Sequence, residues 1–154
     1  MQTHFTKTQL ESSTIIEADS ILRRCVHCGF CTATCPTYIL LGDELDSPRG
    51  RIFLIRDMLE SDAPPKPDVI KHLDRCLTCL SCTTTCPSGV DYMHLLDHGR
   101  HHIEETYQRP LTDRWLRGLL KWLLPKPGLF RLAMVGAKAA RPFAALFPGR
   151  LSAM

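Results

Sequence analysis

The sequence RCVHCGFCTATCP occupies residues 24–36, and RCLTCLSCTTTCP repeats the same cysteine spacing over residues 75–87. In each run, three cysteines are separated by two residues. A fourth follows after three more residues and precedes a proline. The two runs contain all 8 cysteines of the 154-residue chain. This spacing is typical of the ligands of two 4Fe–4S clusters, because closely spaced thiolates can each reach a different iron of one cube. We therefore predict an iron–sulfur protein.

The fourth cysteine of each run is predicted to bind the cluster of the other run. The chain cannot fold back sharply enough to reach the fourth iron of its own cube, and in two-cluster ferredoxins this cysteine crosses over. The proline that follows turns the chain away. The predicted ligands of the first cluster are Cys25, Cys28, Cys31 and Cys86. The predicted ligands of the second cluster are Cys76, Cys79, Cys82 and Cys35.

Structural zinc and disulfide bonds are the alternatives for so many cysteines. Zinc sites usually use two separated Cys-x2-Cys pairs, so the third cysteine of each run and the fourth before proline would have no role. Disulfides require an oxidising compartment. Residues 1–10 are polar and do not resemble a signal peptide. We expect a cytoplasmic iron–sulfur protein and keep a zinc-stabilised interaction module as the alternative of another class.

Charge divides the chain near residue 110. Residues 1–108 carry 10 basic and 15 acidic residues, whereas residues 109–154 carry 9 basic residues against Asp113 alone. We therefore expect an acidic ferredoxin domain over residues 1–110. Residues 111–154 would be a basic amphipathic tail or the start of a further region. No run of about 18 apolar residues indicates a transmembrane helix.

The long connection between the two runs favours helices over strands. Cys35 and Cys76 lie 41 positions apart, whereas small β-type ferredoxins join their runs by a short strand and turn. Ser47 followed by Pro48 is typical of an N-cap and a first helical residue. Apolar residues then recur on one face over residues 49–59, which predicts a helix.

Helices are also expected on both sides of each cysteine run. The apolar pattern predicts them over residues 13–24 and 91–108, and a short helix capped by Asp68 would lead into the second run. We find no convincing strand. The predicted fold class is therefore all-α: an α-helical two-cluster ferredoxin with an internal repeat and a basic amphipathic helical tail.

The tail pattern allows two interpretations. Residues 112–124 have an amphipathic pattern, in which Trp115, Trp122 and several leucines are interspersed with basic residues. The prolines at 125 and 127 end the pattern. Residues 129–146 are basic and rich in small side chains. A basic amphipathic helix with tryptophan can bind a membrane surface. It can equally pack against a partner protein.

Three stretches carry a resemblance to a known family: RCVHCGFCTATCPTY over residues 24–38, DSPRGRI over 46–52 and CPSGVDY over 86–92. They resemble the iron–sulfur subunit of bacterial glycolate oxidase, also called glycolate dehydrogenase. Related subunits serve anaerobic glycerol-3-phosphate dehydrogenase, lactate oxidation and heterodisulfide reduction, so the cysteine runs indicate only the wider group. The residues between the cysteines favour glycolate oxidase.

The resemblance implies electron transfer as a non-catalytic subunit of an oxidoreductase. In that family the subunit relays electrons from a flavin-bearing partner, which oxidises glycolate to glyoxylate, towards quinone. It implies FAD on the partner subunits and a contact with a membrane surface or quinone reductase at the cytoplasmic face of the inner membrane. Family members continue into repeated Cys-Cys-Gly motifs. Because this sequence has no Cys-Cys pair, we expect the N-terminal part of such a subunit.

No catalytic residue and no nucleic-acid partner are predicted. The sequence contains no nucleophile–base pair, phosphate-binding glycine loop or flavin motif. Three roles stay open for Arg49 and Arg51: they hold carboxylates of a partner, they tune a cluster electrostatically, or they are solvated on the helix surface. His27 is expected at a cluster edge or in solvent rather than as a ligand. We expect His94, His98 and His101 on a solvated helix face rather than at a metal site, since no carboxylate or cysteine is placed to complete one.

Overall fold

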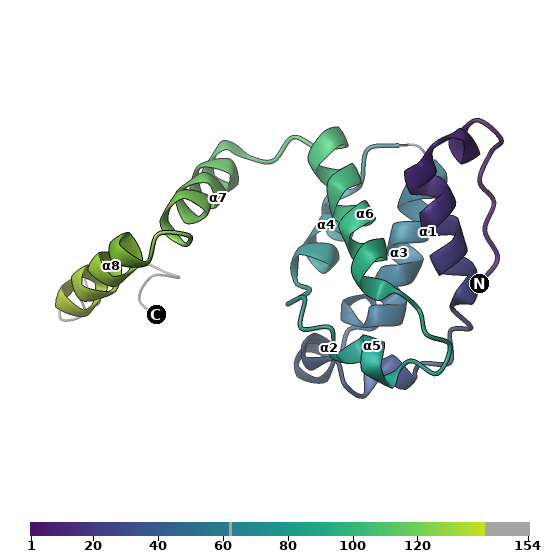
Figure 1. Cartoon of the computed structure of the whole chain (residues 1–154), viewed down its shortest axis with the longest axis horizontal. Coiled ribbons are helices and arrows are strands. Elements are labelled where there is room, and N and C mark those ends of the chain that lie inside the picture. The colour runs from purple at the N-terminus through teal and green to yellow at the C-terminus, as the bar shows by residue number, and fades with distance from the viewer. Residues whose placement is uncertain (62, 141–154) are drawn as a thin grey trace. The chain divides into compact units, whose positions relative to one another are not determined.

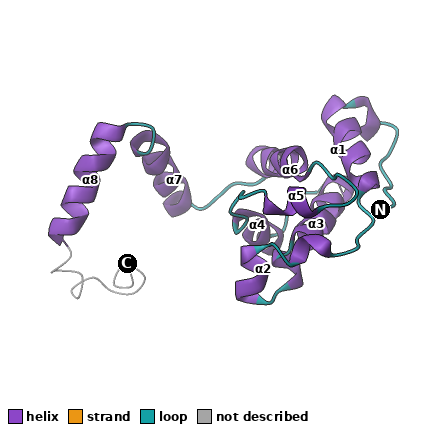
Figure 2. Cartoon of the chain, turned by 60° about the horizontal axis from the view of Figure 1, so that its bottom comes forward, coloured by secondary structure: helices purple, strands orange, loops and turns teal. Residues whose placement is uncertain are grey.

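The computed structural model describes residues 1–61 and 63–140. These residues form helices joined by loops, with no strand among them (Figure 2), which confirms the predicted all-α class. Three elements, written η, are 3-10 helices. In chain order the elements are η1 (Gln9–Glu11), α1 (Ser13–Arg24), η2 (Phe30–Thr32), α2 (Pro36–Leu41), η3 (Glu44–Asp46), α3 (Pro48–Ser61), α4 (Pro67–Asp74), α5 (Ser81–Thr85), α6 (Tyr92–Thr106), α7 (Leu111–Leu123) and α8 (Pro127–Ala140).

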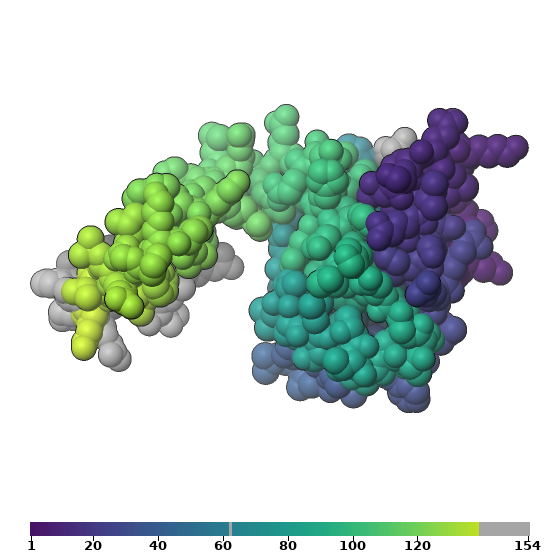
Figure 3. Space-filling view, viewed as in Figure 1, coloured from purple at the N-terminus to yellow at the C-terminus, as the bar shows by residue number. Residues whose placement is uncertain are grey.

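The chain divides into two compact units, the first spanning Met1–Gln108 and the second beginning at Arg109. In the first unit, α3 packs against both α1 and α6, and α1 packs against α6. Figure 3 shows α1 and α6 side by side on one face of this unit. The short helices α2 and α5 lie together at one end of the unit, at the bottom of Figure 1. The two cysteine runs adjoin these short helices.

The apolar core of the first unit lies between its three long helices. Its fully buried side chains include Leu22 of α1, Ile55 of α3, and Leu95 and Ile103 of α6. Burying each such side chain contributes roughly 1.5–3 kcal/mol. The same core cluster includes Cys25 and Cys82 of the two cysteine runs. The helical core therefore forms one wall of the cysteine region.

The start of α3 follows the predicted capping pattern. The Ser47 hydroxyl accepts a hydrogen bond from the Gly50 N–H over 3.0 Å, and Pro48 is the first helical residue. A Cβ atom on Gly50 would lie 2.1 Å from the carbonyl oxygen of Glu44. Glycine at this position therefore allows η3 to lie directly against α3.

The other predicted helices agree with the structure except at their caps. Helix α1 spans the predicted residues 13–24. Asp91 is the N-cap of α6 rather than its first residue, since its carboxylate accepts a hydrogen bond from the His94 N–H over 3.3 Å. The prediction of Asp68 as a cap is wrong. Pro67 takes the first helical position because its φ is preset, so Asp68 lies in the first turn, where a carboxylate favours the helix dipole.

The second unit contains α7 and α8 among the described residues. The predicted amphipathic helix is present as α7, and Trp115 and Trp122 on it are 70% and 53% exposed. Two arginines flank one carboxylate, because Arg109 and Arg117 both pair with Asp113. No helix in the described ranges is long and apolar enough to cross a membrane. The part of the predicted 129–146 segment beyond residue 140 lies outside the described residues.

Candidate iron–sulfur centres

Two cavities gather the cysteines at one end of the first unit. The space between the lining atoms, including space open to solvent, is about 440 Å³ in the first and about 310 Å³ in the second. The cysteines that line the first cavity are Cys25, Cys28, Cys31, Cys82 and Cys86. The cysteines that line the second are Cys35, Cys76, Cys79 and Cys82. Each cavity therefore combines a run with the last cysteine of the other run, and Cys82 lies where the cavities adjoin. The structure brings both predicted ligand sets together, while the ligation of iron stays a prediction.

The cysteine sulfurs are more widely spread than the ligands of one zinc ion. Four thiolates around a zinc, each about 2.3 Å from the metal, lie about 3.8 Å from one another. Among the residues that the structure describes, no three cysteine sulfurs lie within 4.8 Å of one another.

The loops that carry the sulfurs repeat an unusual backbone conformation. His27 and Gly29 have φ values of 56° and 85°, and Thr78 and Leu80 at the matching positions of the second run have 54° and 58°. In each run the two left-handed residues flank one residue that is not among the positive-φ residues. An alternation of left-handed and right-handed residues can make successive N–H groups bind an anion. Only one of the four residues is a glycine, so the other three are strained. This repeat has no signal in the residue types and was therefore not predicted.

Crowding and burial oppose the ionisation of several cysteines. Burial, and then the charges of Cys31 and Cys76, raise the pKa of the Cys82 thiol to about 12. Burial likewise raises the pKa of Cys31. The pKa of Cys79 is lowered, chiefly by hydrogen bonds from Ser81. Thiolates crowded in this way require nearby positive charge, which iron supplies as the protons leave.

Hydrogen-bonding groups reach several of the cysteine sulfurs. The buried Tyr92 hydroxyl donates to Cys76 Sγ over 3.6 Å, and the Val90 N–H donates to Cys86 Sγ over 3.5 Å. A guanidinium N–H of Arg51 reaches Cys35 Sγ over 3.8 Å, and the Thr37 hydroxyl lies 3.2 Å from the same sulfur. Hydrogen bonds to ligand sulfurs help to set the potential of a cluster. Tuning of a cluster was one of the roles left open for Arg51, whereas Tyr92 and Val90 were not predicted as donors.

Residues 21–90 match the family model of the 4Fe-4S dicluster domain. The match contains both cysteine runs and therefore both cavities. Residues 21–90 are thus similar to a 4Fe–4S dicluster domain. The cavity-lining cysteines and this match agree, so iron–sulfur clusters are the cofactors that fit the site.

Residues 21–90 and the residues that flank them are similar to named relatives. Over 143 residues, 93% of this chain, it is 54% identical to the glycolate oxidase iron-sulfur subunit of Escherichia coli and covers 35% of that protein. It is 42% identical over 97 residues to a probable glycolate oxidase iron-sulfur subunit of Bacillus subtilis, which is 62% of this chain and 22% of the relative. These matches confirm the resemblance drawn from the residues between the cysteines.

A more distant relative belongs to another of the predicted groups. The chain is 33% identical over 87 residues to a subunit of the ferredoxin:CoB-CoM heterodisulfide reductase of Methanosarcina mazei, which is 56% of this chain and 49% of that protein. The chain thus spans about a third of the Escherichia coli relative and half or less of the other two. No solved structure matches the chain.

His27 and the histidines of α6 lie in different surroundings. His27 lines the first cavity, as the prediction of a cluster edge requires, and burial lowers its pKa. Three of the four histidines of α6 each pair with a different carboxylate. The pairs are His94 with Asp91 at 2.6 Å, His98 with Glu17 at 3.0 Å and His101 with Glu105 at 3.3 Å. Carboxylates therefore lie beside these histidines, but no two of the three share one.

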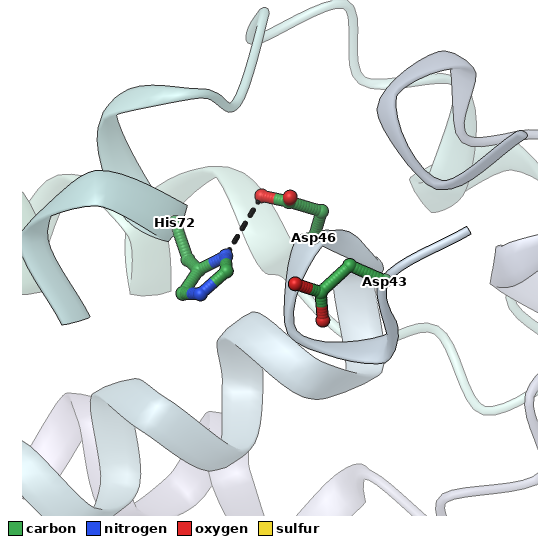
Figure 4. Close-up of side chains that lie close together, drawn as sticks. All are labelled: Asp43, Asp46 and His72. Carbon is green, nitrogen blue, oxygen red and sulfur yellow. Dashed lines mark hydrogen bonds and ion pairs between the residues drawn. The ribbon is translucent and has the colours of Figure 1, made fainter. Parts of the chain in front are cut away.

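A group of side chains beside the second cavity resembles a metal site by distance alone. Ligand atoms of Asp43, Asp46 and His72 lie within 4.8 Å of one another (Figure 4). Both carboxylate oxygens of Asp46 are already engaged: Oδ2 lies 2.7 Å from Arg75 Nη1, and Oδ1 lies 3.3 Å from Arg51 Nη2 and 3.0 Å from His72 Nδ1. Two guanidinium groups would repel a metal cation here. This group is an ionic network and not a metal centre.

Proposed function

We propose that this chain is the electron-transfer part of a glycolate oxidase iron–sulfur subunit. In this proposal it relays electrons from a flavin-bearing subunit that oxidises glycolate to glyoxylate towards an acceptor such as quinone. The observation that carries the proposal is the pair of adjoining cavities, each lined by one cysteine run and the last cysteine of the other. The substrate class rests on the 54% identity to the Escherichia coli glycolate oxidase iron-sulfur subunit.

The proposed ligands are the two crossed sets of four cysteines. Cys25, Cys28, Cys31 and Cys86 would hold one cluster, and Cys76, Cys79, Cys82 and Cys35 would hold the other. Each 4Fe–4S cluster, when bound, takes up and gives back one electron. The chain's own residues hold the sulfurs, donate hydrogen bonds to them and exclude water. Pro48, Cys82 and Tyr92 line both cavities, so these side chains lie between the two sites.

The surface suggests where electrons enter and leave. Cys28 of the first cavity and Cys79 of the second are exposed, whereas Cys25 and Cys35 are buried. Each proposed cluster therefore comes closest to solvent at one edge. We place the flavin subunit and the acceptor at these two edges. FAD would be on the partner, and the assembly would lie in the cytoplasm or at the cytoplasmic face of the inner membrane.

Metal and sulfide analysis tests the cofactor proposal. The full chain, purified without oxygen, should contain about eight irons and eight acid-labile sulfides per chain, the content of two 4Fe–4S clusters. A cluster-ligand variant such as Cys28→Ser should lower both contents together. About two zincs with no labile sulfide would show the zinc-stabilised alternative instead.

Partner capture tests the substrate proposal. A tagged chain should co-purify with a flavin subunit, and glycolate should then reduce the clusters in the absence of oxygen. Glycerol-3-phosphate and lactate, the substrates of related complexes, are tested as control electron donors in the same assay. The similarity to a heterodisulfide reductase subunit favours electron transfer to a disulfide, which is reduced to two thiols, as the second candidate. Cluster reduction by glycerol-3-phosphate or lactate, but not by glycolate, would contradict the glycolate proposal.

A further inference from the structure

Arg51 is a buried cation beside the second cavity. It lies on the inner face of α3, and its side chain is 1% exposed. Its Nε donates to the His72 carbonyl over 2.7 Å, and its Nη2 donates to the Thr37 hydroxyl over 3.0 Å and to Asp46 over 3.3 Å. Its Nη1 donates to Cys35 Sγ over 3.8 Å. The guanidinium therefore joins the proposed cluster ligand Cys35 to the segment that leads into the second cysteine run.

Arg51 forms a buried ion pair beside the second cavity. Its carboxylate partner Asp46 is fully buried. The same carboxylate also binds His72 at 3.0 Å and Arg75 at 2.7 Å, and the Arg75 side chain is 40% exposed. A carboxylate oxygen of Asp43 also lies within 4.8 Å of ligand atoms of Asp46 and His72. What distinguishes Arg51 is therefore that the buried cation of this network is the one that reaches Cys35 Sγ.

The first cavity has no matching charge among the described residues that line it. Cys86 is the counterpart of Cys35, and its sulfur accepts from the neutral Val90 N–H. Arg49 also lines the first cavity, but its side chain is 36% exposed and forms an ion pair with Glu44. An exposed one-to-one pair is screened by water and salt. A donor that reaches Cys35 is therefore a buried guanidinium, whereas the donor that reaches its counterpart Cys86 is a neutral N–H.

We propose that Arg51 is a positioning residue that raises the reduction potential of the cluster held by Cys35 above that of the other cluster. The inference rests on the proposed function, because it needs both clusters. An added electron makes a cluster more negative, and a cation in a low-dielectric interior stabilises that state. A transferred electron would then rest in the second cavity.

A redox titration of the full chain followed by electron paramagnetic resonance tests this inference. The second cluster is identified as the signal lost in Cys76→Ser. Arg51→Gln should lower the equilibrium constant for its reduction at least tenfold, which is about 59 mV for a one-electron couple. The potential of the first cluster should stay unchanged. Asp46→Asn, which removes the opposing charge, should shift the second cluster in the opposite direction.

Two further variants separate charge from structure. Arg51→Lys keeps the charge and should leave the second potential near that of the wild type. Arg56→Gln is the matched control, because it replaces an arginine of the same helix that is paired with Glu60. It should leave both potentials unchanged. If Arg51→Gln fails to hold clusters, the other two variants test the inference. Asp46→Asn should raise the potential of the second cluster, and Arg51→Lys should leave it unchanged.

Two results would overturn the inference. One is an unshifted second potential in Arg51→Gln with both clusters present. The other is a shift of the same sign in Arg51→Gln and Asp46→Asn, which would indicate general loosening of the site. Wild-type protein that lacks eight irons would instead overturn the proposed function, and the inference with it, before any variant is compared.

Discussion

Cys35 and Cys76 line the same cavity although 41 positions separate them in the sequence. Cys35 does not line the cavity of the three cysteines that immediately precede it. Helix α2 begins at Pro36 and carries the chain away from the first run, while α4 ends just before Cys76. Arg51 of α3 binds both Thr37 of α2 and His72 of α4, which helps to hold Cys35 and Cys76 at the same cavity. Each cavity therefore depends on cysteines from both runs.

Replacing Cys35 should therefore damage the cluster of the other run. We expect Cys35→Ser to remove or distort the cluster held mainly by Cys76, Cys79 and Cys82, because its sulfur would complete that set. Cys25→Ser should damage the first cluster instead. Electron paramagnetic resonance of each variant, with the clusters resolved by potential, checks this. The reverse pattern would indicate that each run binds its own cluster without crossing.

A side chain at residue 50 should destabilise the first unit. Gly50→Ala places a Cβ 2.1 Å from the Glu44 carbonyl oxygen, and backbone atoms cannot move aside as a side chain can. We expect a loss of about 3 kcal/mol, the upper part of the range for overpacking. The midpoint of anaerobic thermal unfolding, followed by circular dichroism, measures the effect.

Gly42→Ala is the matched control for this glycine. Gly42 has a φ of 67°, but a Cβ added there would meet no atom within 4 Å, so alanine at this position encounters conformational strain alone. That strain costs about 1–2 kcal/mol. Gly50→Ala should therefore lower the unfolding midpoint more than Gly42→Ala does. Equal midpoints would contradict the close approach of η3 to α3.

Thiol reactivity after iron removal should differ between two cysteines of the second run. Burial raises the pKa of Cys82 to about 12, so at a pH of about 8 its thiol stays protonated and unreactive. Hydrogen bonds from Ser81 lower the pKa of the exposed Cys79, which increases its thiolate fraction. We expect iodoacetamide to modify Cys79 first and the rate at Cys82 to rise as the pH approaches the pKa of that thiol.

Mass spectrometry of peptides from the alkylated chain measures both rates. The cluster-loaded chain is the control, and iron should protect both thiols in it. Equal rates at Cys79 and Cys82 under the same mildly alkaline conditions would show that the iron-free chain does not keep the described burial of Cys82.

The basic tail gives a prediction about membranes. Removing residues 111–154 should abolish co-sedimentation with anionic lipid vesicles and leave both clusters assembled. Each basic residue near such a surface contributes roughly 1 kcal/mol, so added salt should weaken binding by the full chain. The exposed Trp115 and Trp122 would supply the insertion of apolar surface. If the full chain ignores vesicles but needs the tail to retain the flavin subunit, α7 is a docking helix instead.

Local features were predicted well where neighbouring residues settle the conformation. Ser47 with Pro48 identified the start of α3, and the apolar pattern identified α1 over its full length. Asp68 failed as a cap because two good signals for a helix start lie side by side, and the preset φ of Pro67 prevails. The left-handed conformation of Thr78 and Leu80 could not be predicted, since neither residue type favours it.

The cysteine spacing alone was enough to indicate two clusters, because ligand spacing is a local property of the chain. The ionic network of Arg51, Asp46 and His72 is different in kind. Its members come from α3, η3 and α4, and no pattern in the sequence links them. Only the packing of these helices brings a buried guanidinium to the sulfur of Cys35. Charge at a site depends on distances through space, which helix packing sets and residue order does not.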